Sequence, residues 1–137
     1  MKIAVVDDDP IFQFLTCKLI EKIAPGSHEL LSFKDGQDAL EFIRTNRTFL
    51  AVLPELILLD INMPILDGWQ FLDRFKMLGA TDYQPVIYIV SSSIDQADIV
   101  RSQTYAELNG YLKKPLSRQQ LSELLTTNDA SQKTDSL

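Results

Sequence analysis

The chain has 137 residues, of which 45% are hydrophobic, so its length and composition fit one globular domain that buries a core without disulfides. A formal net charge of −6 argues against binding to a nucleic-acid phosphate backbone as its main task. No apolar run approaches the roughly 20 residues that span a bilayer, and Lys2 leads into a short strand-like run rather than a signal peptide. The sequence therefore predicts a cytoplasmic domain that binds neither nucleic acid nor membrane.

The first predicted strand is the β-branched run Lys2–Val6, and three aspartates follow it at residues 7–9. Asp9 followed by Pro10 predicts the start of a helix, because Asp is a favoured N-cap and Pro suits the first helical position. The helix is expected to end before Pro25-Gly26. Apolar residues recur through it at helical spacing and are expected to face the core: Phe12, Leu15, Leu19, Ile20 and Ile23.

A second strand is expected over Glu29–Phe33, and Asp35-Gly36 turns the chain into a helix that ends near Asn46. The run Leu56–Leu59 then has four large aliphatic residues without polar alternation, which is typical of a strand buried on both faces of a parallel sheet. It ends in the single carboxylate of Asp60. Open α/β sheets place their chemistry at the carboxyl ends of such central strands.

The second half of the chain continues the alternation of helix and strand. The expected elements are a helix that opens at Asp67-Gly68, a strand over Pro85–Val90, a helix over residues 95–105, a strand over Gly110–Pro115, and a helix after a capping box at Ser117–Gln120. Three serines, residues 91–93, follow the fourth strand. From Thr127 the chain is polar and aperiodic, which predicts one domain over residues 1–126 and a disordered tail over residues 127–137.

This alternation predicts an α/β protein with a parallel sheet covered by helices on both faces. Asp7, Asp8 and Asp60 would then meet at the carboxyl edge of the sheet, where like charges roughly 4 Å apart repel by on the order of 4 kcal/mol at an effective dielectric near 20. A hard cation such as Mg²⁺ compensates such a cluster, and a nearby lysine can contact a phosphoryl group. These parts fit phosphoryl transfer with Asp60 as the nucleophile, since the Asp7-Asp8 pair suits the metal.

Several motifs occur together in a fixed order. They are Asp7-Asp8 after the first strand, Asp60 followed by Met63-Pro64 and Asp67-Gly68, a serine after the fourth strand, Tyr111, and Lys114-Pro115. This ordered set resembles the receiver domain of two-component response regulators, in particular the single-domain type similar to chemotaxis regulators. The resemblance covers residues 1–126 and implies a flavodoxin-like fold of five βα units with strand order 2-1-3-4-5.

The resemblance also implies a function in a phosphorelay. Asp60 would accept a phosphoryl group from a phosphohistidine of a histidine kinase or phosphotransfer protein. The domain would be a signalling module that catalyses its own phosphorylation and dephosphorylation, rather than an enzyme in the usual sense. Asp8 and Asp60 would ligate Mg²⁺ directly, together with the backbone carbonyl of Asn62, and Asp7 would act mainly through water.

A switch is implied by the same resemblance. Lys114 would contact the phosphoryl group, and its peptide bond to the following proline would be cis. A serine hydroxyl would shift toward the phosphoryl group while Tyr111 rotates inward, which would remodel a face of the fourth helix, fifth strand and fifth helix that binds a downstream protein. Ser91 directly follows the apolar run, whereas counting back from Lys114 favours Ser92. Lys113 competes for the phosphoryl contact, and adjacency to the proline favours Lys114.

Two other functions are compatible with parts of the sequence. A small phosphatase of the haloacid-dehalogenase type would use Asp7 as nucleophile and Asp9 as acid and base, but it leaves the motif from Asp60 to Gly68 unexplained. A receiver-like scaffold that is never phosphorylated would not need the complete set of acids and lysine. The sequence leaves open whether the domain acts as a shuttle, as a diffusible regulator, or within a longer protein.

Overall fold

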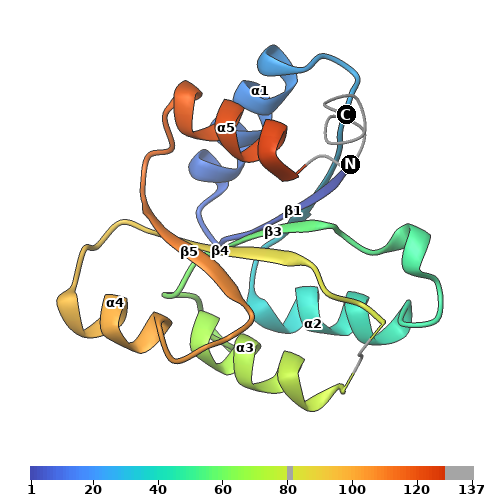
Figure 1. The fold of residues 1–137 in the computed structure, drawn as a ribbon, viewed down its shortest axis with the longest axis vertical. Helices are drawn as coiled ribbons and strands as arrows, with labels where there is room; N and C mark the ends of the chain where they lie inside the picture. The colour runs from blue at the N-terminus through green and yellow to red at the C-terminus, as the bar shows by residue number, and fades with distance from the viewer. Residues whose placement is uncertain (80–81, 129–137) are drawn as a thin grey trace.

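A computed structural model describes residues 1–79 and 82–128, which form a parallel sheet with helices on both faces (Figure 1). The sheet has five strands in the order β2-β1-β3-β4-β5, which confirms the predicted α/β class and strand order. The strands are β1 Lys2–Val6, β2 Glu29–Phe33, β3 Leu56–Leu59, β4 Val86–Ser91 and β5 Leu108–Lys113. Compared with the predicted ranges, β4 ends one residue later and β5 starts two residues earlier.

The helices are α1 Pro10–Ile23, α2 Gly36–Thr45, α3 Gly68–Met77, α4 Gln96–Ser102 and α5 Arg118–Asn128. Asp9 caps α1 as predicted, since its side chain accepts a hydrogen bond from the backbone of Ile11. Helix α5 continues two residues beyond the predicted domain boundary at residue 126, and the rest of the predicted tail lies outside the described residues. Over the described ranges, every helix is too short or too polar to cross a bilayer.

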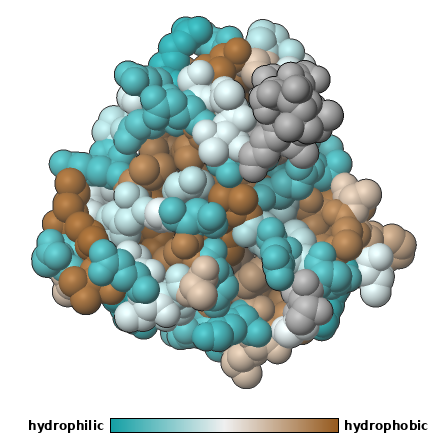
Figure 2. Space-filling model, in the orientation of Figure 1, coloured by the Kyte–Doolittle hydropathy of each residue, from teal (hydrophilic) through white to brown (hydrophobic). Residues whose placement is uncertain are grey.

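Helix α4 is shorter than the predicted range of residues 95–105. It has seven residues and ends at Ser102, whose hydroxyl donates to the Ile99 carbonyl at 2.6 Å. Ile94 and Val100 are exposed, and Figure 2 shows hydrophobic surface in the region of α4 and the segment before it. With few inward apolar residues, the α4 sequence supports only two turns of helix.

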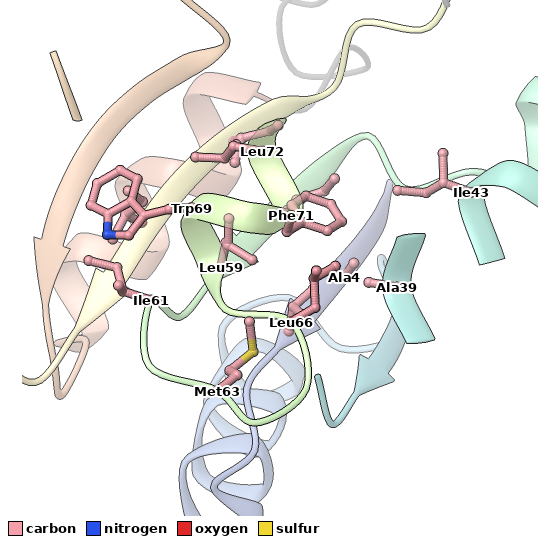
Figure 3. Close-up of a cluster of buried hydrophobic side chains, with 14 of the residues drawn as sticks. Ala4, Ala39, Ile43, Leu59, Ile61, Met63, Leu66, Trp69, Phe71 and Leu72 are labelled. Atoms are coloured by element: carbon pink, nitrogen blue, oxygen red, sulfur yellow. The ribbon is translucent and has the colours of Figure 1, made fainter. Parts of the chain in front are cut away.

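Strand β3 lies at the centre of the sheet and is buried on both faces, as predicted. Its residues alternate between two cores. Ile57 and Leu59 belong to the core beneath α2 and α3, part of which Figure 3 shows around Leu59, Phe71 and Leu72. Leu56 and Leu58 belong to the second core, beneath α1 and α5. Each face of the sheet is therefore packed against its own layer of helices, and the carboxyl ends of the strands lie between these layers.

One predicted core residue is on the surface. Leu15 of α1 is 58% exposed, and the residues of α1 that are buried are Phe12, Thr16 and Ile20. Thr16, not Leu15, therefore continues the inward face one turn after Phe12. The short 3-10 helix η1, Leu50–Val52, was also not predicted.

Candidate functional site

Three carboxylates converge at the carboxyl edge of the sheet. Asp7 and Asp8 follow β1, Asp60 follows β3, and Val6 is paired with Leu59 in the parallel ladder, so the residues after each strand end side by side. One oxygen from each carboxylate lies within 4.8 Å of the others. Asp7 and Asp60 are buried, with 2% and 6% of their surface exposed, whereas Asp8 is exposed. The sequence prediction that these acids meet is confirmed by the geometry.

Lys114 lies beside both buried carboxylates. Its Nζ is 2.5 Å from Oδ2 of Asp7 and 3.6 Å from Oδ2 of Asp60, and its side chain is only 15% exposed. The other oxygens of these carboxylates accept backbone hydrogen bonds, Oδ1 of Asp7 from Asp9 and Oδ1 of Asp60 from Ile61, each at 2.9 Å. The Oδ2 atoms thus face the lysine.

The neighbouring Lys113 is exposed, so Lys114 is the lysine that faces the carboxylates. Its Nζ also lies 4.5 Å from the centre of the Phe12 ring. The bond from Lys114 to Pro115 is cis, which confirms the expectation from the resemblance. Phe12 was predicted only as a core residue, and nothing in the sequence pattern separates this second contact from ordinary core packing.

The cluster carries more negative charge than its lysine neutralises. Burial, followed by the charge of Asp7, raises the pKa of Asp60 from 3.8 to about 6, although Lys114 acts in the opposite direction. Burial likewise raises the pKa of Asp7. Hard oxygen ligands around an excess of negative charge fit Mg²⁺, and the exposed Asp8 leaves the cluster open to solvent. The residues present therefore suit that ion.

The two candidate serines after β4 differ in burial. Ser91 is the last residue of β4 and is fully buried, and its Oγ accepts a hydrogen bond from the backbone of Ser93 at 3.2 Å. Its carbonyl accepts from the backbone N–H of Lys114 at 2.8 Å, which joins the end of β4 to the start of the lysine segment. Ser92 is exposed. Of the two candidates, Ser91 is the one that is buried and whose backbone is bonded to Lys114.

The pairing of β4 with β5 has an irregularity that the sequence analysis missed. The register shifts between Ile87 and Tyr88, which pair with Leu108 and Gly110 respectively. Asn109 is skipped in the pairing, and its side-chain oxygen accepts a hydrogen bond from the Ile87 backbone at 3.2 Å. The Asn109-Gly110 dipeptide was the available signal, because such pairs disfavour regular strand.

Tyr111 and Asn62, the other predicted site residues, lie on the segments that flank the cluster. Tyr111 is partly buried in β5, and its hydroxyl donates to the Ser93 carbonyl at 3.0 Å. Asn62 is exposed in the loop between β3 and α3. That loop folds back tightly, since a Cβ atom on Gly68 would lie 2.5 Å from the Asp60 carbonyl oxygen. Gly68 thus allows a close backbone approach that the motif alone did not reveal.

Comparisons with known proteins agree with this geometry. Residues 3–126 match the family model for the response regulator receiver domain. The chain is 31% identical over 120 residues to the probable methanogenesis regulatory protein FilR2 of Methanothrix harundinacea, covering 87% of this chain and 75% of that protein. It is 29% identical over 126 residues to the sensor histidine kinase RcsC of Escherichia coli, covering 92% of this chain but only 12% of the kinase.

A crystal structure of a two-component response regulator from Cytophaga hutchinsonii superposes with a TM-score of 0.80 at 26% identity, covering 92% of this chain and 94% of that one. The chain belongs to the response regulator receiver domain family. It is therefore a signalling domain that accepts a phosphoryl group, and such domains have a phosphodonor kinase and downstream targets.

Proposed function

We propose that Asp60 is the residue that accepts the phosphoryl group, from a phosphohistidine of a kinase or phosphotransfer protein in the cytoplasm. The observation that carries the proposal is the position of Asp60, buried at the end of the central strand, 3.6 Å from Lys114 and within 4.8 Å of the other two acids. Asp8, Asp60 and the backbone carbonyl of Asn62 hold Mg²⁺ in this proposal, and Asp7 acts through water. When bound by these residues, Mg²⁺ would neutralise charge on the acids and on the incoming phosphoryl oxygens.

The transfer step needs positioning more than covalent chemistry. An oxygen of Asp60 forms a bond to phosphorus while the bond from phosphorus to the imidazole nitrogen of the donor breaks. The electron pair of that bond stays on the nitrogen, which then takes up a proton. Lys114 turns from Oδ2 of Asp7 to the new phosphoryl oxygen, an exchange of one anionic partner for another. Attack of water on phosphorus then breaks the bond to the Asp60 oxygen, restores the carboxylate and releases inorganic phosphate. In this proposal the domain catalyses both its own phosphorylation and its dephosphorylation.

The switch that we propose uses Ser91 and Tyr111. Ser91 is buried at the edge of the site, and the Tyr111 hydroxyl contacts Ser93 only two residues away, so a shift of the serine segment removes the partner of the tyrosine. The resulting change alters the face formed by α4, β5 and α5. The exposed residues Ile94, just before α4, and Val100, within it, supply apolar area for a downstream protein.

A second apolar surface favours contact with the phosphodonor. Ile11, Phe14 and Leu15 lie at helical spacing on α1, which starts directly after the acids, and each is at least 58% exposed. A donor protein must bring its phosphohistidine to the same edge of the sheet. We propose that it packs against these three residues, because apolar residues grouped at helical spacing on a surface indicate a docking site.

The direct test is the intact mass of the protein after incubation with acetyl phosphate and Mg²⁺. The wild-type protein is expected to gain about 80 Da, the mass of HPO₃, in a Mg²⁺-dependent reaction that forms an acyl phosphate. Asp60→Asn is expected to gain nothing. Asp9→Asn is the matched control, because it removes a carboxylate from the same edge but retains an N-cap residue.

The same experiment separates the alternatives. Peptide mapping that finds the phosphate on Asp7 would identify the phosphatase-type nucleophile. Asp9 is poorly suited to assist that chemistry, since its side chain caps α1. A folded wild-type protein that binds Mg²⁺ but gains no mass, from either acetyl phosphate or a phosphorylated donor protein, would support a scaffold and contradict the assignment of Asp60.

A further inference from the structure

The side-chain amide of Gln13 faces three backbone carbonyls beside the acid cluster. Its Nε2 lies 2.7 Å from the Val5 oxygen, 3.1 Å from the Asp7 oxygen and 3.0 Å from the Phe33 oxygen. These carbonyls come from the ends of β1 and β2 and from the first residue of the acidic turn. One side chain therefore joins two strand ends to the segment that carries two of the three acids.

The chemistry of the three acceptors fixes the orientation of the amide. Carbonyl oxygens cannot donate, so only the NH₂ end of Gln13 can face them. The other end of the side chain, Oε1, is buried and has no hydrogen-bond partner among the described residues. A buried acceptor without a partner is unfavourable, so the contacts of the NH₂ group outweigh it in this arrangement.

The start of α1 also holds the turn, through backbone hydrogen bonds that do not depend on the Gln13 side chain. The Gln13 N–H donates to the Asp9 carbonyl at 3.1 Å, and Oδ1 of Asp7 accepts from the Asp9 N–H at 2.9 Å. The turn over residues 7–9 is thus fixed at both ends. Without the NH₂ group, the negative ends of three carbonyl dipoles would converge close to buried carboxylates with the Asp7 N–H still donating to the Phe33 oxygen but no side-chain donor, and we expect the turn to relax to separate them.

We propose that Gln13 is a positioning residue that holds the backbone of Asp7 and Asp8 at the spacing needed to bind Mg²⁺. It contacts neither the ion nor the phosphoryl group and acts through the turn. The inference rests on the proposed function, because it assigns Mg²⁺ to the same acids. Groups that hydrogen-bond directly to metal ligands typically contribute about 10- to 100-fold to metal affinity, and because Gln13 acts through the backbone we expect the lower end of that range.

The test is the Mg²⁺ dissociation constant of Gln13→Met, measured by calorimetry with the metal alone. Methionine has a similar length but no donor, so Gln13→Met is expected to bind Mg²⁺ at least about tenfold more weakly. The Mg²⁺ concentration that gives half-maximal phosphorylation by acetyl phosphate should rise by the same factor, while the rate at saturating Mg²⁺ changes less. Asn46→Leu is the control, because it removes another side-chain amide that donates to a backbone carbonyl, at the far end of α2.

A second readout needs no metal. The Asp7 amide donates to the Phe33 carbonyl at 2.9 Å, and its hydrogen exchange in the metal-free protein should accelerate in Gln13→Met more than in Asn46→Leu at matched global stability. If Gln13→Met fails to fold, Gln13→Asn keeps the amide but shortens its reach and is read in the same way.

A dissociation constant within twofold of wild type in the folded variant, with unchanged exchange at Asp7, overturns the role of Gln13. Wild-type protein that binds no Mg²⁺ contradicts the proposed function instead.

Discussion

Asp60 is buried next to another acid, and this position has a measurable consequence for stability. Its pKa in the folded protein without metal is about 6, above its ordinary 3.8, so the folded state binds the proton more tightly than the unfolded chain does. The stability that the neutral carboxyl contributes is fully present below about pH 4 and is lost as the pH rises through about 6. At neutral pH the ionised carboxylate therefore lowers the stability of the metal-free protein.

Asp60→Asn is expected to raise the free energy of unfolding at pH 7.5 in EDTA, by about 1–3 kcal/mol, because the amide is neutral at every pH. The gain should shrink toward pH 4. Some pH dependence should remain, since the pKa of Asp7 is also raised. Urea unfolding at several pH values checks this, with Asp9→Asn as the control for loss of a nearby charge. A variant no more stable than wild type at pH 7.5 would show that the burial of Asp60 carries no electrostatic cost.

Gly68 is the residue whose lack of a side chain shapes the site most directly. A Cβ atom there would lie 2.5 Å from the Asp60 oxygen and 2.9 Å from the Ile61 Cα, both of them backbone atoms. Gly68→Ala is therefore expected to lower stability by about 1–3 kcal/mol and to weaken Mg²⁺ binding, because the backbone at Asp60 must move.

Gly26→Ala is the matched control for Gly68→Ala. Gly26 has a φ of +69°, but no atom of the described residues lies near its missing Cβ, so its substitution should cost about 1–2 kcal/mol and leave Mg²⁺ binding unchanged. Urea unfolding and calorimetry measure both quantities. Equal effects of the two variants on Mg²⁺ affinity would argue that Gly68 matters only for general stability.

At the residue scale, the site residues that could be predicted from the sequence are those whose position follows from the strand pattern alone. Asp7, Asp8 and Asp60 each follow a buried strand, so parallel pairing brings them together whatever the details of packing. The contacts of Gln13 could not be predicted, because they depend on how the ends of β1 and β2 pack against α1, which no residue pattern within α1 reveals. The burial difference between Ser91 and Ser92 depends on where β4 ends, which its apolar pattern located only to within a residue.

At the scale of elements, α1 presents two different faces. Phe12 packs against the core beneath α1 and α5, whereas Leu15 is exposed although both fit the same apolar pattern. The sequence pattern does not separate Phe12 from Leu15, since an exposed apolar stripe and a buried one have the same spacing. The distinction depends on which face α5 and the sheet cover. The length of α4 was overestimated because its end also depends on tertiary contacts. Tyr105 lies beyond the last residue of α4, and its ring stacks on Trp69 with ring centres 5.5 Å apart.

Mutations on the two faces of α1 are expected to differ in their effect on stability and on phosphotransfer. Phe12→Ala should lower the free energy of unfolding by about 3–5 kcal/mol, as expected for a buried aromatic residue. Leu15→Gln should change it by no more than about 0.5 kcal/mol. In the proposed function, Leu15→Gln should nevertheless slow phosphorylation by a phosphohistidine donor protein while leaving the reaction with acetyl phosphate unchanged. Equal rates with the donor protein would remove α1 as the docking surface.

At the scale of the whole molecule, the two cores share one sheet, and β3 contributes alternate residues to each. Ile57 faces the core beneath α2 and α3, which includes Trp69, and Leu58 faces the core beneath α1 and α5. Loss of packing on either face therefore loosens the same strand, and with it the hydrogen bonds to β1 and β4. This coupling implies that the described parts of the chain unfold as one cooperative unit.

Leu58→Ala tests that coupling, because Leu58 and Trp69 lie in different cores. The variant should lose about 2–5 kcal/mol, the usual range for a buried leucine. The urea midpoint measured by Trp69 fluorescence should equal the midpoint measured by far-UV circular dichroism. Both midpoints should also move together in Ile57→Ala, which removes side-chain volume from the other core. A fluorescence transition that stays at the wild-type midpoint while the dichroism shifts would mean that the two helix layers unfold separately. In that case a structural change that begins at Asp60 would be transmitted to only one of the two helix layers.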